Sequence, residues 1–390
     1  METMQKSINK MTKAPLNDRI RILHIIKSLG RGGAETLLPE TLSLHNQELF
    51  EFHYIYFLPW KDQMVNQIKD AGGIIHCFEA INNIEIFRKV KDIIAYIKQN
   101  EIKLIQCHLP WAGIVGRIAG RLTNIPVIYT EHNKWERYHK LTYFINKLSF
   151  GLQTNAIAVS NDVALSIRKH YKHSKPEINV VLNGINVNKF TRNSIPNNLI
   201  REKLKIPESA IVIGTACVFR VQKRLLAWLE IAKLIHDEFP NVHFIIAGDG
   251  PLKDVIQQKA QGLHTFEYVH FVGLQENIKP YLKAMDIFMM SSEFEGLPIA
   301  LLEAMSMECM PACTAAGGIP ELIKNQQNGL LAPVTSPLDL VQLLRPFLQS
   351  PNKILQLAAA ARQTVVNSFS LHQMVQQLET IYSNTLNSKN

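Results

Sequence analysis

The feature that most constrains the fold is a repeated alternation of short apolar segments with amphipathic stretches. Residues 21–29 (RILHIIKSL), 52–58 (FHYIYFL) and 126–132 (PVIYTEH) are such apolar segments, and each ends at a polar or glycine-containing turn. Between them lie longer stretches with apolar residues at helical spacing, of which 86–100 (IFRKVKDIIAYIKQN) is one. This pattern is typical of parallel strands joined by helical crossovers. The first half of the chain is therefore predicted to form a doubly wound α/β domain.

The second half repeats the pattern. Strands are predicted at 211–219 (IVIGTACVF), 242–250 (VHFIIAGDG) and 286–292 (DIFMMSS), with helices between them. A length of 390 residues also favours two domains over one core. The predicted organisation is a polar tail (1–19), a first Rossmann-like domain (20–185), an Asn-rich linker carrying Pro196 (186–205), a second Rossmann-like domain (206–369) and a final helix (370–390).

The composition favours a soluble protein of the cytoplasm. Hydrophobic residues make up 46% of the chain and charged residues 19%, and no apolar run approaches the roughly 20 residues that span a bilayer. The polar N-terminal segment lacks the apolar core of a secretion signal. The five cysteines are scattered and odd in number, which favours a reducing compartment.

Positive charge is concentrated in the first half. Residues 1–185 hold 24 Lys and Arg against 16 Asp and Glu, whereas residues 186–390 hold 18 against 17. Such an excess favours an anionic partner, either a lipid surface or a phosphorylated acceptor. Ordinary solubilising charge is the competing interpretation. No nucleic-acid-binding module is recognisable, so nucleic acid is not expected as a partner.

Two carboxylates bracket a short apolar run in Glu295-Gly-Leu-Pro-Ile-Ala-Leu-Leu-Glu303. Pro298 suits the first position of a helix, where its missing N–H is not needed. Glu295 then precedes the helix and Glu303 lies in its second turn. The free N–H groups of the first turn favour an anion between the two acids. The alternative is an amphipathic helix with two solvated acids.

Other polar residues follow predicted strands. Gly30-Arg-Gly-Gly-Ala-Glu35 leads from the first strand into a helix, a position at which backbone N–H groups can approach a phosphate. His132 ends the strand 126–132. Arg220 and Lys223 follow the strand 211–219, where two cations could neutralise a diphosphate. In a parallel sheet such strand ends share one edge, which is where ligands bind.

Together these motifs resemble the retaining family 4 glycosyltransferases, which have the GT-B fold. The resemblance extends over roughly residues 20–370 and is most specific in 286–331. It implies two Rossmann-like domains that face a central cleft, with the C-terminal helix crossing back to the first domain. The Ala316-Gly-Gly-Ile-Pro-Glu321 and Asn328-Gly-Leu-Leu segments follow the acidic motif as they do in the family.

The same resemblance implies roles for individual residues. Glu295 contacts the donor sugar and diphosphate region, Glu303 holds the nucleotide ribose, and His132 contacts the transferred sugar. The family usually separates its Arg and Lys by more residues than lie between Arg220 and Lys223 here. The predicted catalytic residues are His132, Glu295, Arg220 and Lys223; the donor-binding residues are Gly32, Gly33, Gly250, Gly296, Leu297 and Glu303; the acceptor or membrane face is Lys134, Trp135, Arg137 and Lys140.

No metal and no cofactor is expected besides the nucleotide-sugar co-substrate. The chain has no Asp-x-Asp, the pair on which metal-dependent sugar transferases depend. Cations and helix N-termini must then stabilise the leaving diphosphate. The resemblance implies retention by a front-face route, in which the leaving phosphate accepts the acceptor's proton.

The predicted function is transfer of a sugar from a UDP- or GDP-linked donor to a glycan or lipid-linked acceptor. Bacterial surface polysaccharide, lipopolysaccharide or glycolipid assembly is the preferred setting, with peripheral attachment to the cytoplasmic membrane face. Two alternatives from other classes remain: a nucleotide-sugar epimerase on the same fold, and a non-catalytic protein that binds nucleotide sugar.

Overall fold

The computed structural model describes residues 19–195 and 199–388, which form two compact α/β units. The first unit runs to Val181 and also includes the chain from Met374 onward. The second unit is Leu182–Gln373. Apart from Arg19, the predicted polar tail lies outside the described residues, and so does Pro196 of the predicted linker.

The first unit is built on a seven-stranded parallel sheet. Its order is β3-β2-β1-β4-β5-β6-β7. The two central strands β4 and β5 are buried at every residue, because helices cover both faces of a doubly wound sheet. The strands are β1 (Ile20–Ile26), β2 (Phe50–Tyr56), β3 (Ile74–Cys77), β4 (Leu104–His108), β5 (Val127–Glu131), β6 (Asn155–Ala158) and β7 (Glu177–Val180).

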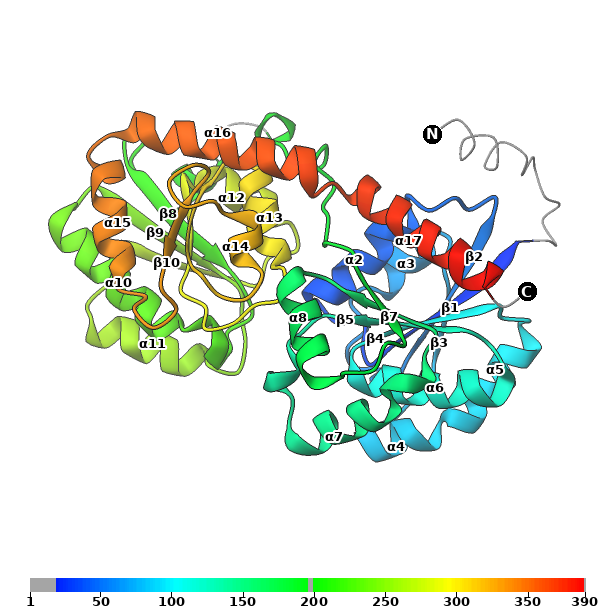
Figure 1. Cartoon of the computed structure of the whole chain (residues 1–390). Helices are drawn as coiled ribbons and strands as arrows, with labels where there is room; N and C mark the ends of the chain where they lie inside the picture. The colour runs from blue at the N-terminus through cyan, green and yellow to red at the C-terminus, as the bar shows by residue number, and fades with distance from the viewer. Residues whose placement is uncertain (1–18, 196–198, 389–390) are drawn as a thin grey trace. The chain divides into compact units, whose positions relative to one another are not determined.

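Two apolar cores lie on opposite faces of this sheet. Ile22 and Ile26 of β1 belong to one core, and Leu23 and Ile25 belong to the other, as the two-residue period of a strand requires. Figure 1 shows helices on both faces of the sheet. The helices are α2 (Gly33–Leu42), α3 (Val65–Asp70), α4 (Asn83–Arg88), α5 (Val90–Gln99), α6 (Pro110–Thr123), α7 (Lys140–Ser149), α8 (Asn161–His170) and α17 (Leu371–Asn387), with 3-10 turns η2 (Trp135–Arg137) and η3 (Phe150–Leu152).

The second unit has a six-stranded parallel sheet in the order β10-β9-β8-β11-β12-β13. It too has a core on each face. The strands are β8 (Ile211–Ala216), β9 (Val242–Ala247), β10 (Val269–Gly273), β11 (Ile287–Met290), β12 (Met310–Thr314) and β13 (Leu330–Ala332). The helices are α9 (Leu199–Lys203), α10 (Leu225–Glu238), α11 (Lys253–Gly262), α12 (Lys279–Ala284), α13 (Ile299–Ser306), α14 (Ile319–Leu322), α15 (Asp339–Leu348) and α16 (Pro351–Ser368), with turns η4 (Arg192–Ser194) and η5 (Val221–Lys223).

Each sheet has one point at which its strand order reverses. In the first unit this point lies between β1 and β4, and in the second unit it lies between β8 and β11. The connections that leave the two strands there run to opposite sides, and a crevice opens at their carboxyl ends. Ligand sites are therefore expected at these two strand pairs.

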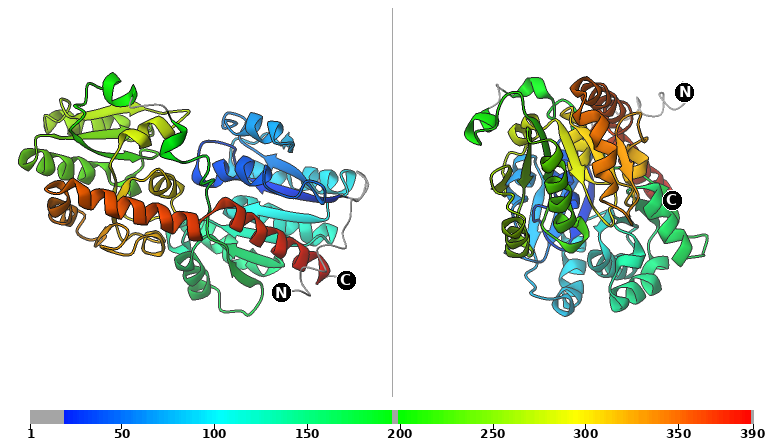
Figure 2. Two further views of the ribbon diagram at one scale, coloured as in Figure 1. Left: turned by 90° about the horizontal axis from the view of Figure 1, so that it is seen from above. Right: turned by 90° about the vertical axis from the view of Figure 1, so that its left-hand side faces the viewer.

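The predicted fold class is confirmed, and the final helix packs on the first unit as predicted. Leu378 and Tyr382 of α17 are buried in the same core as β1 and β2, and the Tyr382 hydroxyl donates a hydrogen bond to the Gln106 side chain of β4. Figure 2 shows α17, in dark red, along the blue and cyan strands of this unit.

Three details differ from the sequence predictions. The stretch 86–100 was expected as one helix but forms the end of α4 and then α5, which are separated at Lys89. Helix α4 also starts earlier than predicted, because the Asn82 side chain caps it through the N–H groups of Ile84 and Glu85. The short edge strands β7 and β13 were not predicted. The described part of the predicted linker belongs to the second unit, where Phe190 joins the core.

Two buried histidines lie side by side at the reversal point of the first sheet. Nδ1 of His24 on β1 is 3.1 Å from Nε2 of His108 at the end of β4. Burial lowers the pKa of His24 from 6.5 to about 3, and nearby His45 acts in the same direction. Burial, with His24 and His132 nearby, also holds the pKa of His108 well below its ordinary value. Both imidazoles are therefore neutral in the folded protein.

These depressed pKa values predict loss of stability in acid. Unfolding exposes His24, which then takes up a proton below its unfolded pKa of about 6.5, whereas the folded state binds that proton only near pH 3. Stability present above about pH 6.5 is therefore lost as the pH falls toward 3. The loss of folding free energy between about pH 7 and about pH 5 approaches 2 kcal/mol for one such histidine.

We expect the urea midpoints of unfolding at these two pH values to differ less in His24→Gln than in wild type. The exposed His173→Gln should retain the wild-type difference, and an equal flattening in both variants would contradict the assignment.

Candidate active site

The reversal point of the second sheet holds an ion pair. Lys223 lies in η5 after β8, and Glu295 lies in the loop after β11. The Lys223 Nζ is 2.6 Å from Oε1 of Glu295, and the two side chains are only 18% and 10% exposed. The pair therefore joins the two strands between which the ligand crevice of such a sheet opens.

Hydroxyl groups fix the loops that carry this pair. The Ser291 hydroxyl lies 3.0 Å from the backbone carbonyl oxygens of Lys223 and Arg224. Ser292 donates a hydrogen bond to Glu295 Oε1 at 2.6 Å, and its own carbonyl accepts one from Thr314 of β12. Three neighbouring strand ends are thus tied together, which holds the carboxylate in one position.

A glycine pair after β12 lets this loop pack closely. Gly317 has φ +58°, and a Cβ there would lie 1.8 Å from the carbonyl oxygen of Glu295. Gly318 donates its N–H to the carbonyl of Gly296 at 2.9 Å. A side chain at Gly317 would push the acidic loop away, so this segment supports the site from behind.

Gly250 has a similar role after β9. A Cβ at Gly250 would lie 2.6 Å from the backbone nitrogen of Phe219, in the loop that leads to Arg220. The Phe219 N–H also donates to the carbonyl of Asp249 at 2.9 Å. Gly250 therefore shapes the loop beside Arg220, which is itself exposed.

Helix α13 begins beside the ion pair. Pro298 occupies the N-cap position, and its side chain cannot accept a hydrogen bond from the N–H groups of the first turn. Leu297 is buried, and its carbonyl accepts a hydrogen bond from the buried Asn183 side chain at 3.1 Å. The half-buried Glu303 lies in the second turn, as predicted. The first turn of α13 therefore has no side-chain cap, and the N–H groups of such a turn favour an anion.

The glycine-rich loop of the first unit leads into α2. Gly32 is the residue before this helix and Gly33 is its first residue. The Glu35 carboxylate folds back over the helix start, so that a Cβ at Gly32 would lie 2.3 Å from Glu35 Oε2. The helix N-terminus already has an acidic side chain beside it, as in a capping box.

A buried carboxylate organises the loop after β5. Glu131 is 0% exposed and accepts hydrogen bonds from the Tyr129 hydroxyl at 2.8 Å and the Trp135 indole N–H at 2.9 Å. The Tyr138 hydroxyl and the backbone N–H of His132 also donate to it. Burial raises the pKa of Glu131, while these hydrogen bonds act in the opposite direction. One carboxylate thus fixes the backbone that carries His132.

His132 extends the pair of buried histidines. Its Nε2 lies 3.3 Å from Nδ1 of His108, which places its ring at the carboxyl edge of the first sheet. Burial lowers the pKa of His132 from 6.5 to about 4. At neutral pH this imidazole is uncharged, so it can exchange hydrogen bonds with a neutral hydroxyl but brings no positive charge to the site.

The prediction that Trp135 belongs to an acceptor or membrane face is wrong. Its side chain is 0% exposed, because the indole N–H donates a hydrogen bond to buried Glu131 and the ring packs against Phe150. Lys134 pairs with Asp162 at 2.9 Å. Arg137 and Lys140 are exposed. Of the predicted acceptor or membrane residues, only Arg137 and Lys140 are therefore exposed.

The predicted residues fall into two groups. Within the second unit the structure brings together Lys223, Glu295, Gly296 and Leu297 at one sheet edge, with Arg220, Gly250 and Glu303 on adjoining segments. Gly32, Gly33, His132 and the 134–140 run belong to the first unit. The sequence reasoning missed Ser292, His24 and His108. The available signals were the polar His24 within an apolar strand and His108 at the end of the apolar segment 103–109 (KLIQCHL).

Among residues 19–195 and 199–388, no three His, Cys, Asp or Glu side chains are grouped so as to hold a metal ion. Within the same residues no helix combines the length and the apolar character needed to cross a membrane.

Comparisons with known proteins agree with this architecture. The chain is 24% identical to the "UDP-Gal:alpha-D-GlcNAc-diphosphoundecaprenol alpha-1,3-galactosyltransferase" of Escherichia coli, over 94% of this chain and 97% of that protein. It is 26% identical to the "Capsular polysaccharide biosynthesis glycosyltransferase CapH" of Staphylococcus aureus, over 75% and 80% of the two chains.

Solved structures match the fold along almost the whole chain. Anabaena HepE in complex with UDP-glucose superposes with a TM-score of 0.83 at 19% identity, covering 94% of this chain and all of that one. Sucrose-phosphate synthase from Thermosynechococcus elongatus gives a TM-score of 0.80 at 16% identity, with the same coverage. At this identity the matches establish the GT-B fold alone.

Two family profiles cover most of the chain. Residues 69–189 match "Glycosyltransferase Family 4", and residues 196–364 match "Glycosyl transferases group 1". The predicted family and enzyme class are confirmed, in preference to an epimerase or a non-catalytic binding protein. The chain belongs to the family 4, group 1 glycosyltransferases and is a glycosyltransferase with two parallel-sheet domains of the GT-B type.

Proposed function

We propose that the enzyme transfers a sugar, with retention, from a UDP- or GDP-linked donor bound at the carboxyl edge of the second sheet. The observation that carries this proposal is the Lys223–Glu295 pair, 2.6 Å apart at the reversal point and beside the uncapped start of α13. The HepE structure, solved with UDP-glucose, supports a nucleotide sugar as the donor.

Lys223 and Arg220 stabilise the leaving group in this proposal. As the glycosidic bond breaks, negative charge grows on the β-phosphate, and cations and N–H groups already aimed at that oxygen lower the barrier. Lys223 is paired with Glu295, four residues before α13 begins, so in this proposal the ammonium and the first-turn N–H groups of α13 act on the same anion. No metal ion is needed for this neutralisation.

In this proposal Glu295 stabilises the positive charge that develops on the transferred sugar. The anomeric carbon acquires oxocarbenium character as the leaving group departs, and a nearby carboxylate stabilises positive charge. Free of ligand, Glu295 has Lys223 and Ser292 as partners. Binding of a diphosphate gives Lys223 a second anionic partner, which leaves Glu295 positioned by Ser292 to face the sugar hydroxyls. The leaving phosphate then accepts the acceptor's proton.

The nucleotide ribose is assigned to Glu303, whose carboxylate can accept hydrogen bonds from both ribose hydroxyls. Gly296 and Leu297 contribute backbone groups of the loop between the two acids. In the first unit, we assign recognition of a sugar hydroxyl to His132 and recognition of a phosphate to Gly32 and Gly33. A neutral His132 suits a sugar hydroxyl.

The acceptor is proposed to be a glycan or a lipid-linked sugar in bacterial surface polysaccharide or lipopolysaccharide assembly, at the cytoplasmic face of the membrane. The named function of the Escherichia coli relative, with its diphosphoundecaprenol-linked acceptor, supports a lipid-linked substrate. The positive excess of residues 1–185 suits such an anionic acceptor.

Nucleoside diphosphates should stabilise the folded enzyme. A ligand that binds only the folded state at about 100 times its dissociation constant adds about 2.7 kcal/mol. We therefore expect UDP or GDP to raise the melting temperature in a thermal-shift assay, with inorganic phosphate as the control anion. If no nucleoside diphosphate gives a shift at millimolar concentration, the proposed donor site is wrong.

The two acids of the motif should separate binding from transfer. Glu303→Ala removes the proposed ribose contact, so it should weaken binding of the bare nucleotide by about tenfold, the cost of a charge-assisted hydrogen bond. Glu295→Gln should leave nucleotide binding nearly unchanged and lower kcat. Calorimetry and initial rates measure the two effects.

Glu267→Ala, at an exposed position just before the amino end of β10 and so at the sheet edge opposite the site, is the matched control and should change neither quantity. Equal loss of nucleotide binding in Glu303→Ala and Glu295→Gln would contradict the division of roles.

A further inference from the structure

Helix α7 of the first unit turns apolar side chains outward. Leu141, Phe144 and Leu148 are 57%, 59% and 70% exposed. Their spacing of three and four residues places them along one side of the helix. We call these three residues the α7 stripe. The opposite side carries the fully buried Asn146, whose side-chain oxygen accepts a hydrogen bond from buried Arg117 at 2.8 Å. The helix is thus anchored by its polar side, and its apolar side is exposed.

Lysines border the stripe. Lys140 and Lys147 are seven residues apart, which places both along the same flank of α7, and both are exposed. An apolar stripe with cations along its edge is the arrangement of a helix that lies in a membrane interface, with its apolar side among the acyl chains. Lysine stems can also cover apolar surface while the ammonium stays at the phosphate level.

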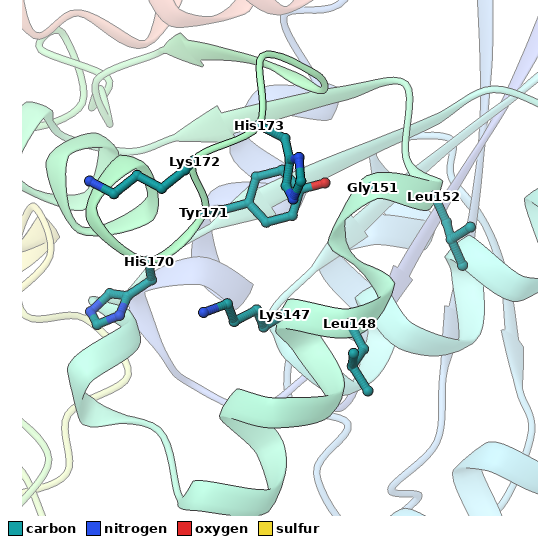
Figure 3. A pocket seen from close by; sticks show the side chains of 8 residues that line it. All are labelled: Lys147, Leu148, Gly151, Leu152, His170, Tyr171, Lys172 and His173. Atoms are coloured by element: carbon teal, nitrogen blue, oxygen red, sulfur yellow. The ribbon is translucent and has the colours of Figure 1, made fainter.

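A pocket adjoins the end of the stripe. It has a volume of about 410 Å³ and lies between α7–η3 and the segment after α8 (Figure 3). Figure 3 shows Lys147 and Leu148 on α7, and Tyr171, Lys172 and His173 on the segment that faces them. Gly151 makes room for this arrangement, since a Cβ there would lie 2.7 Å from the Tyr171 hydroxyl.

The pocket wall combines apolar and cationic groups. Leu148 and Leu152 are largely exposed and provide the apolar part. Lys147 and Lys172 provide cations. His170 also lines the pocket, but its ring lies 3.1 Å from the Glu136 carboxylate, and the same carboxylate pairs with Lys169. The two lysines therefore carry the charge that a ligand would meet.

We propose that the α7 stripe and this pocket together bind the surface of an anionic phospholipid bilayer. Leu141, Phe144 and Leu148 insert among the upper acyl chains, and Lys147 and Lys172 contact lipid phosphates. This inference rests on the proposed transfer to a lipid-linked acceptor, because it supplies the surface on which such an acceptor is met. Like charges disfavour a second copy of the chain on this cationic surface.

The test uses the full chain and lipid vesicles, without donor or acceptor. Co-sedimentation with phosphatidylcholine vesicles is compared with co-sedimentation when part of the lipid is phosphatidylglycerol. We expect binding to the anionic vesicles only, and release at high salt, where the Debye length falls to about 3 Å. The double variants Phe144→Ser/Leu148→Ser and Lys147→Glu/Lys172→Glu should each lower the partition coefficient by at least about tenfold.

Matched controls lie in the second unit. Phe266→Ser/Leu274→Ser removes an exposed phenylalanine and leucine, and Lys324→Glu/Lys353→Glu makes the same change in charge. Both control variants should bind vesicles as wild type does. Equal binding of wild type to neutral and anionic vesicles, or an equal loss in the controls, would overturn the proposal. Concentration-dependent self-association that the stripe variant abolishes would instead assign the surface to a second copy.

The nucleotide response separates this inference from the proposed function. The two surface variants should retain the melting-temperature rise with UDP or GDP, which also shows that they fold. Wild type that responds to nucleotide but never binds vesicles would refute the membrane surface and leave the donor site standing.

Discussion

The ion pair between Lys223 and Glu295 is the contact on which the proposed donor site depends. It spans the two strands where the second sheet reverses its order, and it is mostly shielded from water. Neither partner can be removed without leaving the other charge uncompensated. Ser292 donates a hydrogen bond to the Glu295 carboxylate, and Gly317 and Gly318 pack against the backbone of Glu295 and Gly296. The site is therefore organised before any ligand arrives, as electrostatic catalysis requires.

The first unit repeats this strand order with one further strand, but its reversal point carries neutral imidazoles where the second unit has an ion pair. There, burial keeps His24, His108 and His132 neutral, and the carboxylate that organises the loop, Glu131, is hidden beneath it. A neutral imidazole suits sugar hydroxyls, whereas a cation beside helix N–H groups suits a diphosphate. Two units with the same order of strands around the reversal point therefore present different chemistry at their strand ends.

Much of this could be predicted from the sequence, and the failures have physical reasons. Fully buried parallel strands are continuous apolar runs, so most strands and both domains were recognisable. The edge strand β7 contains Glu177 and Asn179 and has no buried residue, so it lacks a continuous apolar run, and β13 has only three residues. The positions of Glu295 and Glu303 followed from local helix geometry. The burial of Trp135 could not be predicted in this way, because it depends on a hydrogen bond to Glu131 that only the folded structure shows. The local sequence does not show which side of the 134–140 segment packs on the domain. The exposed α7 stripe escaped prediction for the same reason.

The central claim is that the second unit's sheet edge holds the donor diphosphate. A crystal structure of the enzyme with UDP or GDP tests it most directly. We predict that the β-phosphate contacts Lys223 and the first-turn N–H groups of α13, with the ribose hydroxyls on Glu303. A nucleotide bound elsewhere, with Lys223 and Glu295 still paired and touching no ligand, would contradict the account.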